Sequence, residues 1–296
     1  MTSRFEGFAG NLFRTPLRTP AQTQSGLNDD SQFLPLLDFL DESNCSLARN
    51  FGGSPFLMSG SLALVGSGEY LPGMAEFERS LIEDGLKNQK APRFVQIPTA
   101  AGRESRDRIL YWQELGRVQA NLLGVEQVFL PIFDRDAAHN SEFLSQIRDS
   151  ALIYMSGGDP HYLANTLRGT PILDALVENW NSGGSLAGCS AGAMVMSSKI
   201  PNFRISRSAP TEGFNLLPDV RVIPHFNKFF KWIPESAAKI LLDTPGDSVL
   251  IGIDEMTALV RRSGEPDWRV YGEAKVHILK GLPTQQLSHD ERVIIG

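Results

Sequence analysis

A series of short apolar segments, each ending in small residues, is the feature that most constrains the fold of this chain. Five of them follow one another between residues 62 and 193: LALVGSG, RFVQIPTAAG, VEQVFLPI, ALIYMSGGDP and GSLAGCSAGA. Longer stretches with apolar residues at helical spacing separate them, such as RDRILYWQELGRVQANLL. Uninterrupted apolar strands are typical of parallel sheets that helices cover on both faces. The sequence therefore predicts an α/β protein with a doubly wound, mostly parallel sheet.

The ends of these segments predict where a functional site would lie. In open α/β sheets the functional groups gather at the carboxyl ends of the strands, and Gly-Ser-Gly, Pro-Thr-Ala, Gly-Gly-Asp and Cys-Ser-Ala-Gly all fall there. Three later segments, VRVIPHF, SVLIGIDEMTALVRR and WRVYGEAKVHIL, are also typical of strands. Because the last two have little helix between them, we expect an antiparallel part near the C-terminus.

Residues 1–56 differ in composition from residues 57–296, which we interpret as the α/β domain with its own core. The first part is rich in Ser, Thr, Pro, Gln and Asn, and one apolar patch, FLPLLDFL at residues 33–40, interrupts it. We expect an N-terminal extension with a short helix that docks on the domain or on a partner subunit, which would make the protein a homodimer. Disorder of this extension is the alternative.

Composition excludes some functions and partners. The net charge of -6 gives no general case for nucleic-acid binding, which favours basic surfaces. No apolar run approaches the ~20 residues that cross a membrane, so no membrane partner is expected. The two cysteines, Cys45 and Cys189, cannot form a disulfide framework and fit a reducing, cytoplasmic compartment. The basic start of the chain would also suit an organellar transit peptide, and that alternative stays open.

The segment GCSAG, residues 188–192, matches the G-x-S-x-G pattern of a nucleophile elbow. In that motif a serine occupies a tight turn between a strand and a helix, and backbone N–H groups of the following residues face the reacting carbonyl group. Ser190 is therefore the candidate nucleophile and Ala191 a candidate oxyanion donor, with a packing turn as the alternative. Cys189 is a rival nucleophile, but it lies one position before the centre of the motif, which predicts a buried and inert thiol.

A serine nucleophile needs a base and an acid that orients the base. Of the five histidines, His225 is the best candidate base because it ends the apolar segment VRVIPHF and should lie at the carboxyl end of a strand. Asp254 and Glu255 follow another apolar segment, GIDEMTALV. Adjacent strand residues face opposite sides, so at most one of them can point to the site, and the pattern alone does not choose between them.

The loop SGGDP, residues 156–160, is the remaining candidate element. Two glycines after a strand allow backbone N–H groups to converge on an oxyanion, which favours Gly157 and Gly158 as site residues. The alternative is a simple strand-to-helix turn in which Asp159 caps the helix. The turn Gly66-Ser67-Gly68 does not predict a dinucleotide site, because Leu71 replaces the third glycine of G-x-G-x-x-G.

The order Gly-Gly-Asp, G-C-S-A-G-A, P-H-F and G-I-D-E-x-T-A resembles the cyanophycinase and aspartyl dipeptidase family of serine peptidases. The resemblance covers roughly residues 57–279. It implies a three-layer α/β/α fold similar to class I glutamine amidotransferases, which is flavodoxin-like. It also implies that Ser190 is the nucleophile, His225 the base and Glu255 the acid. Thus the resemblance, and not the strand pattern, selects Glu255 over Asp254.

Two departures from the family pattern bear on the substrate. Cyanophycinases usually show Gly-Gly-Asp-Gln, where this chain has Pro160, and they show Asp-Gln-His-Phe followed by several arginines. Here Ile223 and Pro224 precede the histidine, and Lys228 and Lys231 follow it. The residues that would bind an arginine-branched aspartate polymer are not reproduced. A small peptide or another amide is therefore the expected substrate.

The sequence thus predicts an amide hydrolase without metal or cofactor, since no His, Cys and carboxylate cluster has ligand spacing. Backbone N–H groups of Gly158 and Ala191 would bind the oxyanion, and Gly157, Asp159 and Lys228 would bind substrate. Three alternatives remain. One is an α/β-hydrolase-type esterase that uses Ser190, Asp254 and either His277 or His289. The second is a non-catalytic binding protein on the same fold. The third is an amidotransferase that uses Cys189.

Overall fold

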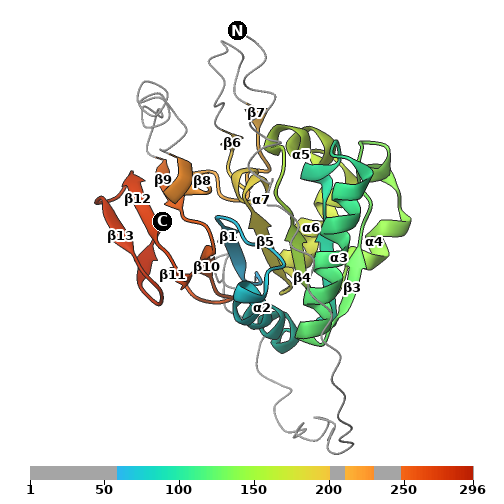
Figure 1. Ribbon diagram of the computed structural model, residues 1–296, viewed down its shortest axis with the longest axis horizontal. Coiled ribbons are helices and arrows are strands. Elements are labelled where there is room, and N and C mark those ends of the chain that lie inside the picture. The colour runs from blue at the N-terminus through green and yellow to red at the C-terminus, as the bar shows by residue number, and fades with distance from the viewer. Residues whose placement is uncertain (1–58, 201–210, 230–247, 296) are drawn as a thin grey trace, which may run out of the picture. The chain divides into compact units, whose positions relative to one another are not determined.

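The computed structural model describes residues 59–200, 211–229 and 248–295. In these residues the main sheet has eight strands in the order β14-β11-β10-β1-β5-β4-β2-β3 (Figure 1). They are β1 (Leu62–Val65), β2 (Ala91–Ile97), β3 (Glu126–Phe129), β4 (Ser150–Met155), β5 (Ser185–Cys189), β10 (Thr257–Arg261), β11 (Asp267–Gly272) and β14 (Arg292–Ile294). The neighbours from β1 to β3 are parallel, and the other three pairings are antiparallel. The predicted α/β class with a mostly parallel central sheet is confirmed.

Helices cover the main sheet on both faces, and its central strands are accordingly buried. Every residue of β1, β4 and β5 is buried. The chain moves outward from β1 through β2 to β3 and then returns through β4 to β5. Right-handed crossovers therefore place the intervening helices of the two halves on opposite faces. The outward half carries α2 (Ala75–Lys87) and α3 (Arg106–Leu123), and the returning half carries α4 (Glu142–Ile147), α5 (Pro160–Leu167) and α6 (Pro171–Asn181).

Local signals account for where these helices begin and end. The Ser105 side chain accepts a hydrogen bond from the Arg108 N–H and caps α3, which ends at Gly124 in the left-handed region with φ 72°. Short 3-10 turns precede or connect the helices: η2 (Pro72–Met74), η3 (Thr99–Ala101) and η4 (Ala137–His139). The four-residue helix α7 (Ala191–Met194) follows β5 directly. The carboxyl ends of β1, β2, β4 and β5 thus lie together at one edge of the sheet.

A second sheet was not expected from the sequence. It has four strands in the order β13-β12-β9-β8, namely β8 (Val220–Ile223), β9 (Val249–Ile253), β12 (Val276–Lys280) and β13 (Gln285–Leu287). Strands β8 and β9 are parallel, whereas β12 is antiparallel to β9 and β13 to β12. The segment SVLIGIDEMTALVRR therefore contains two strands in two different sheets. It turns at residues 254–256, where Met256 has a φ of 55°.

The remaining elements are small. Strands β6 (Lys199–Ile200) and β7 (Thr211–Glu212) pair with each other, and α8 (Phe226–Phe229) follows β8. The proposed extension of residues 1–56, with its segment FLPLLDFL and Cys45, lies outside the described residues, and so does Lys231. The division at residue 56 stays a prediction. None of the helices in the described ranges has the length and apolar character that a membrane span requires.

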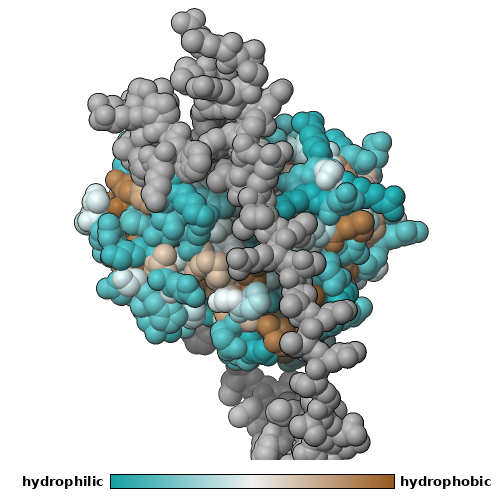
Figure 2. Space-filling model, viewed as in Figure 1, coloured by the Kyte–Doolittle hydropathy of each residue, from teal (hydrophilic) through white to brown (hydrophobic). Residues whose placement is uncertain are grey.

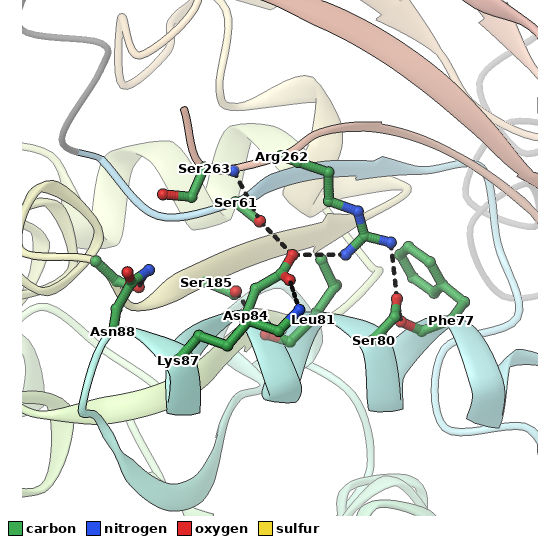
Figure 3. A network of polar contacts seen from close by, with 11 residues as sticks. Ser61, Phe77, Ser80, Leu81, Asp84, Lys87, Asn88, Ser185, Arg262 and Ser263 are labelled. Carbon is green, nitrogen blue, oxygen red and sulfur yellow. Dashed lines mark hydrogen bonds and ion pairs between the residues drawn. The ribbon is translucent and has the colours of Figure 1, made fainter. Parts of the chain in front are cut away.

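A polar network joins α2 to the end of the main sheet that lies away from the carboxyl ends (Figure 3). Asp84 of α2 accepts hydrogen bonds from Ser61 Oγ at 2.6 Å and from Arg262 Nη1 at 2.7 Å. Arg262 Nη2 also donates to Ser80 Oγ at 2.8 Å. The side chains of Arg262 and Asp84 are only 13% and 15% exposed, so solvent screens this ion pair weakly. The network therefore holds the start of β1, the end of β10 and helix α2 together.

We expect Asp84→Asn to lower the free energy of unfolding by about 1–3 kcal/mol, because it leaves the largely buried Arg262 guanidinium without its counter-charge. The measurement is urea denaturation of the two proteins at neutral pH. The matched control is Glu178→Gln, which removes the counter-charge of Arg148 in a pair whose side chains are 57% and 64% exposed, and should change little. Equal midpoints for Asp84→Asn and the wild type would show that the network does not stabilise the fold.

Candidate active site

Ser190 lies in a strained turn between β5 and α7. Its φ of 49° and ψ of −105° are rare for a residue with a side chain. Its backbone N–H donates to the Val65 carbonyl at 2.9 Å, which anchors the turn to β1. The neighbouring glycines are required by space, because a Cβ on Gly188 would lie 2.3 Å from the Gly192 carbonyl oxygen. A Cβ on Gly192 would lie 2.4 Å from the Met155 carbonyl oxygen. The turn thus has the local geometry expected of a nucleophile elbow.

His225 and Glu255 form a hydrogen-bonded chain with Ser190. The Nε2 atom of His225 lies 3.2 Å from Ser190 Oγ, and its Nδ1 atom lies 3.0 Å from Glu255 Oε1. His225 follows β8 with a φ of 51°, and Glu255 lies in the turn between β9 and β10. The strands that precede these two residues, β8 and β9, both belong to the second sheet. The three residues, which are 30 and 35 positions apart in sequence, meet beside the carboxyl end of β5.

The electrostatics of Glu255 favour the tautomer that this chain needs. The hydrogen bond with His225, opposed in part by desolvation and aided by Lys228, holds the pKa of the Glu255 carboxyl below its usual range. A charged Glu255 accepts a hydrogen bond from Nδ1–H of His225. The Nε2 atom is then unprotonated and can accept the hydroxyl hydrogen of Ser190. The side chains of His225 and Glu255 are 13% and 22% exposed, so the pair is partly screened from water.

The Asp254 side chain points away from Ser190, His225 and Glu255 and pairs with a different histidine. Its Oδ1 atom lies 3.1 Å from His277 Nε2, and its Oδ2 atom accepts from the Lys275 N–H at 3.2 Å. The ring of His277 packs against Phe226, the residue after His225, with 4.5 Å between ring centroids. The structure therefore brings together Asp254 and His277 of the alternative triad, but the side chain hydrogen-bonded to Ser190 is that of His225.

The other histidines make contacts elsewhere. Their ring nitrogens lie at hydrogen-bond distance from Arg135 O for His139, Thr211 Oγ1 for His161 and Gly272 N for His289. His289 is also stacked edge-on against Tyr271, and its side chain is 57% exposed. These positions give none of the three a hydrogen bond to Ser190 in the structure described.

The loop after β4 passes next to the nucleophile. A Cβ on Gly157 would lie 3.4 Å from Ser190 Cβ. Gly158 has a φ of 139°, and a Cβ there would lie 2.4 Å from the Ala100 carbonyl oxygen, so only glycine fits. Asp159 Oδ1 accepts from the backbone N–H groups of His161 and Tyr162 at 2.9 and 3.0 Å and caps α5. The capping alternative for Asp159 is therefore present, and its contact with substrate stays a prediction.

Ala191 and Gly158 can supply oxyanion donors. Ala191 is the first residue of α7, and the N–H groups of a first helical turn have no partner within the helix. In the part of the chain that the structure describes, neither Ala191 N–H nor Gly158 N–H has a hydrogen-bond acceptor. Both residues flank Ser190, one in sequence and one across the loop. Their use as an oxyanion hole stays a prediction that this geometry permits.

Cys189 is fully buried beneath the elbow. Its Sγ atom lies 2.8 Å from Glu69 Oε2, and burial together with the Glu69 carboxyl raises the pKa of the thiol well above its usual range. A thiol that resists ionisation is a poor nucleophile. The position and the chemistry agree with the expected inert cysteine and disfavour the amidotransferase alternative.

The sequence model of peptidase family S51 matches residues 62–267, about two thirds of the chain. The chain belongs to peptidase family S51. This confirms the family that the order of the motifs predicted. A cyanophycinase of Trichormus variabilis is 31% identical over 190 residues, which are 59% of this chain and 59% of that protein. An uncharacterized peptidase of Listeria monocytogenes is 27% identical over 207 residues, which are 67% of this chain and 91% of that one. This S51 chain thus spans about three fifths of the length of the cyanophycinase that it matches.

Two solved structures resemble this S51 chain. The crystal structure of a peptidase from an acI-B1 Actinobacterium has 66% sequence identity and a TM-score of 0.78, and the match covers 81% of this chain and 98% of that one. A putative peptidase E protein from Listeria monocytogenes has 22% identity and a TM-score of 0.52 over 73% of this chain and 100% of that one. The second likeness concerns the fold alone.

Lys228 lies beside Glu255, the candidate acid. Its Nζ atom is 2.5 Å from Glu255 Oε2, and its side chain is 52% exposed. The cation therefore already compensates the charge of Glu255, on the side away from His225. Binding of substrate by Lys228, as the sequence suggested, stays a prediction, and a substrate carboxylate would share the cation with Glu255.

Three buried polar residues near the carboxyl end of β1 were not singled out from the sequence. Glu69 and Tyr70 follow the Gly-Ser-Gly turn at the carboxyl end of β1, and Glu78 lies on α2. Glu69 accepts from the Gly157 N–H at 2.9 Å, and the Tyr70 hydroxyl lies 2.7 Å from Ser156 Oγ. Their position at a strand end was the available signal. For Glu69 and Tyr70 the strand end does not by itself show which loop they contact, and Glu78 on α2 has no such signal.

Glu78 makes the stability of this S51 fold depend on pH. Burial raises the pKa of its carboxyl from 4.5 to about 8, against hydrogen bonds from the Gln119 amide and the Tyr70 N–H. Between about pH 4.5 and 8 the folded protein holds a proton that the unfolded chain has lost. The contribution of Glu78 to stability is therefore complete at low pH and decreases as pH rises through this window.

We expect Glu78→Gln to remove this dependence. Between about pH 5 and pH 8, the free energy of unfolding of the wild type should fall relative to that of the variant by on the order of 2–4 kcal/mol. Urea denaturation of both proteins at half-unit pH steps measures the difference. Glu178→Gln, on the exposed surface, is the control and should follow the wild type at every pH. Parallel curves for Glu78→Gln and the wild type would contradict the raised pKa.

Proposed function

We propose that the chain is a serine peptidase in which Ser190, His225 and Glu255 form the catalytic triad. The hydrogen-bonded chain from Glu255 through His225 to Ser190 Oγ is the observation that carries this proposal. Oγ attacks the carbonyl carbon of the amide while its proton moves to His225 Nε2. The same proton then passes to the leaving amine, and water hydrolyses the acyl-enzyme by the reverse proton transfers. Membership of peptidase family S51 supports the same chemistry.

The backbone N–H groups of Gly158 and Ala191 stabilise the oxyanion in this proposal. They belong to two loops that flank Ser190, and a helix start provides N–H groups without an intrahelical partner. Donors arranged in advance stabilise the charge that develops on the carbonyl oxygen in the transition state. The absence of a metal and of a cofactor stays an expectation from sequence.

The substrate in this proposal is a small peptide rather than the cyanophycin polymer. Pro160 replaces the glutamine that usually follows Gly-Gly-Asp in cyanophycinases, and Lys228 stands where arginines are usual. Gly157, Asp159 and Lys228 bind the substrate in this proposal, as the sequence suggested. A cytoplasmic location and a homodimer complete the proposal, and both rest on the sequence alone.

Cleavage of a peptide library, followed by mass spectrometry, tests the proposal together with two histidine variants. His225→Gln removes the base and should lower cleavage by at least about a thousandfold. His277→Gln, which would be equally severe in an esterase that uses His277 as its base, should retain most of the activity because His277 contacts Phe226 and Asp254 rather than Ser190.

The remaining alternatives predict different results in the same assay. An esterase would cleave activated esters and leave the library intact. A Cys189 enzyme would be inhibited by thiol reagents and would not react with a fluorophosphonate. A binding protein would neither cleave peptides nor be labelled. An equal loss of activity in both histidine variants would contradict the assignment of His225 as the base.

A further inference from the structure

Glu69 lies at the junction of the two loops that flank the nucleophile. Its Oε1 atom accepts from the Gly157 N–H at 2.9 Å, and its Oε2 atom lies 2.8 Å from Cys189 Sγ. Because Cys189 is protonated, its thiol donates to this oxygen. Gly157 immediately precedes Gly158, and Cys189 immediately precedes Ser190. One carboxyl group therefore links the loop that carries one candidate oxyanion donor to the turn that carries the other.

The Glu69 carboxyl group is buried and lies close to the backbone of Gly157. Glu69 is 4% exposed, and a Cβ on Gly157 would lie 2.9 Å from its Oε1 atom. No lysine or arginine in the described ranges forms an ion pair with this carboxyl group. A buried carboxyl group held only by neutral donors costs free energy of folding that an apolar residue of similar size would not cost. What this carboxyl group provides in return is a hydrogen bond to each of the two loops.

The neighbouring residue anchors the same loop. The Tyr70 hydroxyl lies 2.7 Å from Ser156 Oγ, and the Tyr70 N–H donates to Glu78. The turn after β1 thus restrains two consecutive residues of the loop after β4, residues 156–160, through the side chains of Glu69 and Tyr70. The hydrogen bonds between Tyr70 and Ser156 and between Gly157 and Glu69 fix these two residues, and they thereby orient the peptide group that carries the Gly158 N–H.

We propose that Glu69 is a positioning residue for the oxyanion hole, which sets the separation between the N–H groups of Gly158 and Ala191. The proposal rests on the proposed serine peptidase function. Glu69 does not touch the substrate. Its effect therefore belongs to the transition state, in which the oxyanion is formed, and not to binding of the uncleaved peptide.

The variants separate the two hydrogen bonds of Glu69. Glu69→Leu removes both and should lower kcat by on the order of a hundredfold with little change in KM, as expected for a displaced oxyanion donor. Glu69→Gln keeps an acceptor for the Gly157 N–H and should restore part of the loss. Cys189→Ala removes only the thiol donor, and its effect should be smaller than that of Glu69→Leu and larger than that of Cys189→Ser. Glu178→Gln is the surface control.

Two probes distinguish positioning from packing. The rate of fluorophosphonate labelling at Ser190 reports on the oxyanion hole, because the phosphonyl oxygen occupies it, and it should fall in the same order as kcat. The affinity for a product peptide reports on ground-state binding and should stay constant. Thermal unfolding shows which variants fold, and if Glu69→Leu does not fold, Glu69→Gln and Cys189→Ala carry the test.

Three results would overturn the proposal. One is a folded Glu69→Leu variant that keeps kcat and labelling rate within about threefold of the wild type. The second is an equal weakening of labelling and of product binding, which would indicate general damage to the site. The third is a wild-type protein that neither cleaves peptides nor is labelled at Ser190. In that case the proposed function fails, and the role of Glu69 fails with it, whereas the first two results leave the function intact.

Discussion

Ser190→Ala should abolish peptide cleavage, with a loss in kcat on the order of a million-fold. The variant removes the only atom that this mechanism uses to form the acyl-enzyme, while the turn keeps its backbone and its anchor to Val65. The measurements are peptide cleavage, fluorophosphonate labelling followed by mass spectrometry, and thermal unfolding. Labelling should disappear together with cleavage, and the melting temperature should change little, since alanine fits wherever serine does.

The control for this experiment is Ser198→Ala, at a serine beyond α7. Its hydroxyl donates to the Pro218 carbonyl at 2.8 Å and faces solvent, so cleavage and labelling should persist. A loss of less than tenfold in Ser190→Ala, with unchanged unfolding, would remove Ser190 from the mechanism. Labelling of another residue in the wild type would do the same.

Glu255→Gln should lower kcat on the order of ten-thousand-fold, far more than Asp254→Asn. An amide at position 255 can donate to Nδ1 of His225 and favour the tautomer whose Nε2 carries the hydrogen, which cannot accept a proton from Ser190. Asp254 instead contacts His277, so its variant should act only through the packing of Phe226. Kinetics of the two variants on the same peptide provide the comparison.

The pH dependence of the wild type gives an independent check on Glu255. The hydrogen bond with His225 lowers the pKa of this carboxyl, so its contribution to stability is present above its usual pKa and is lost as pH falls through the lowered value. Glu255 should therefore stay charged at neutral pH. Should Asp254→Asn prove the more damaging variant, the acid has been assigned to the wrong residue.

The sequence alone determined the features that depend on neighbours in the chain. The apolar runs predict buried strands because β1, β4 and β5 are covered on both faces. The glycines of GCSAG predict the elbow because neighbouring backbone lies so close to them that a Cβ atom would not fit. The strand-to-helix turn SGGDP predicts Asp159 as a helix cap in one of its two interpretations, and the structure has this cap. The Asp159 cap follows from hydrogen bonds within a few residues, whereas the apolar runs and the glycines of GCSAG reflect packing against distant elements that the local pattern already indicates.

Only the tertiary structure decided the features that depend on residues far apart in sequence. The segment around residues 254–256 turns from one sheet into another, and the direction of that turn sends Glu255 to His225 and Asp254 to His277. Strand alternation separates the two carboxylates but cannot say which side the site occupies. The proposed role of Glu69 depends on the contact between the turn after β1 and a loop 88 residues later. Contacts of this kind depend on how the sheets pack, and no local pattern encodes them.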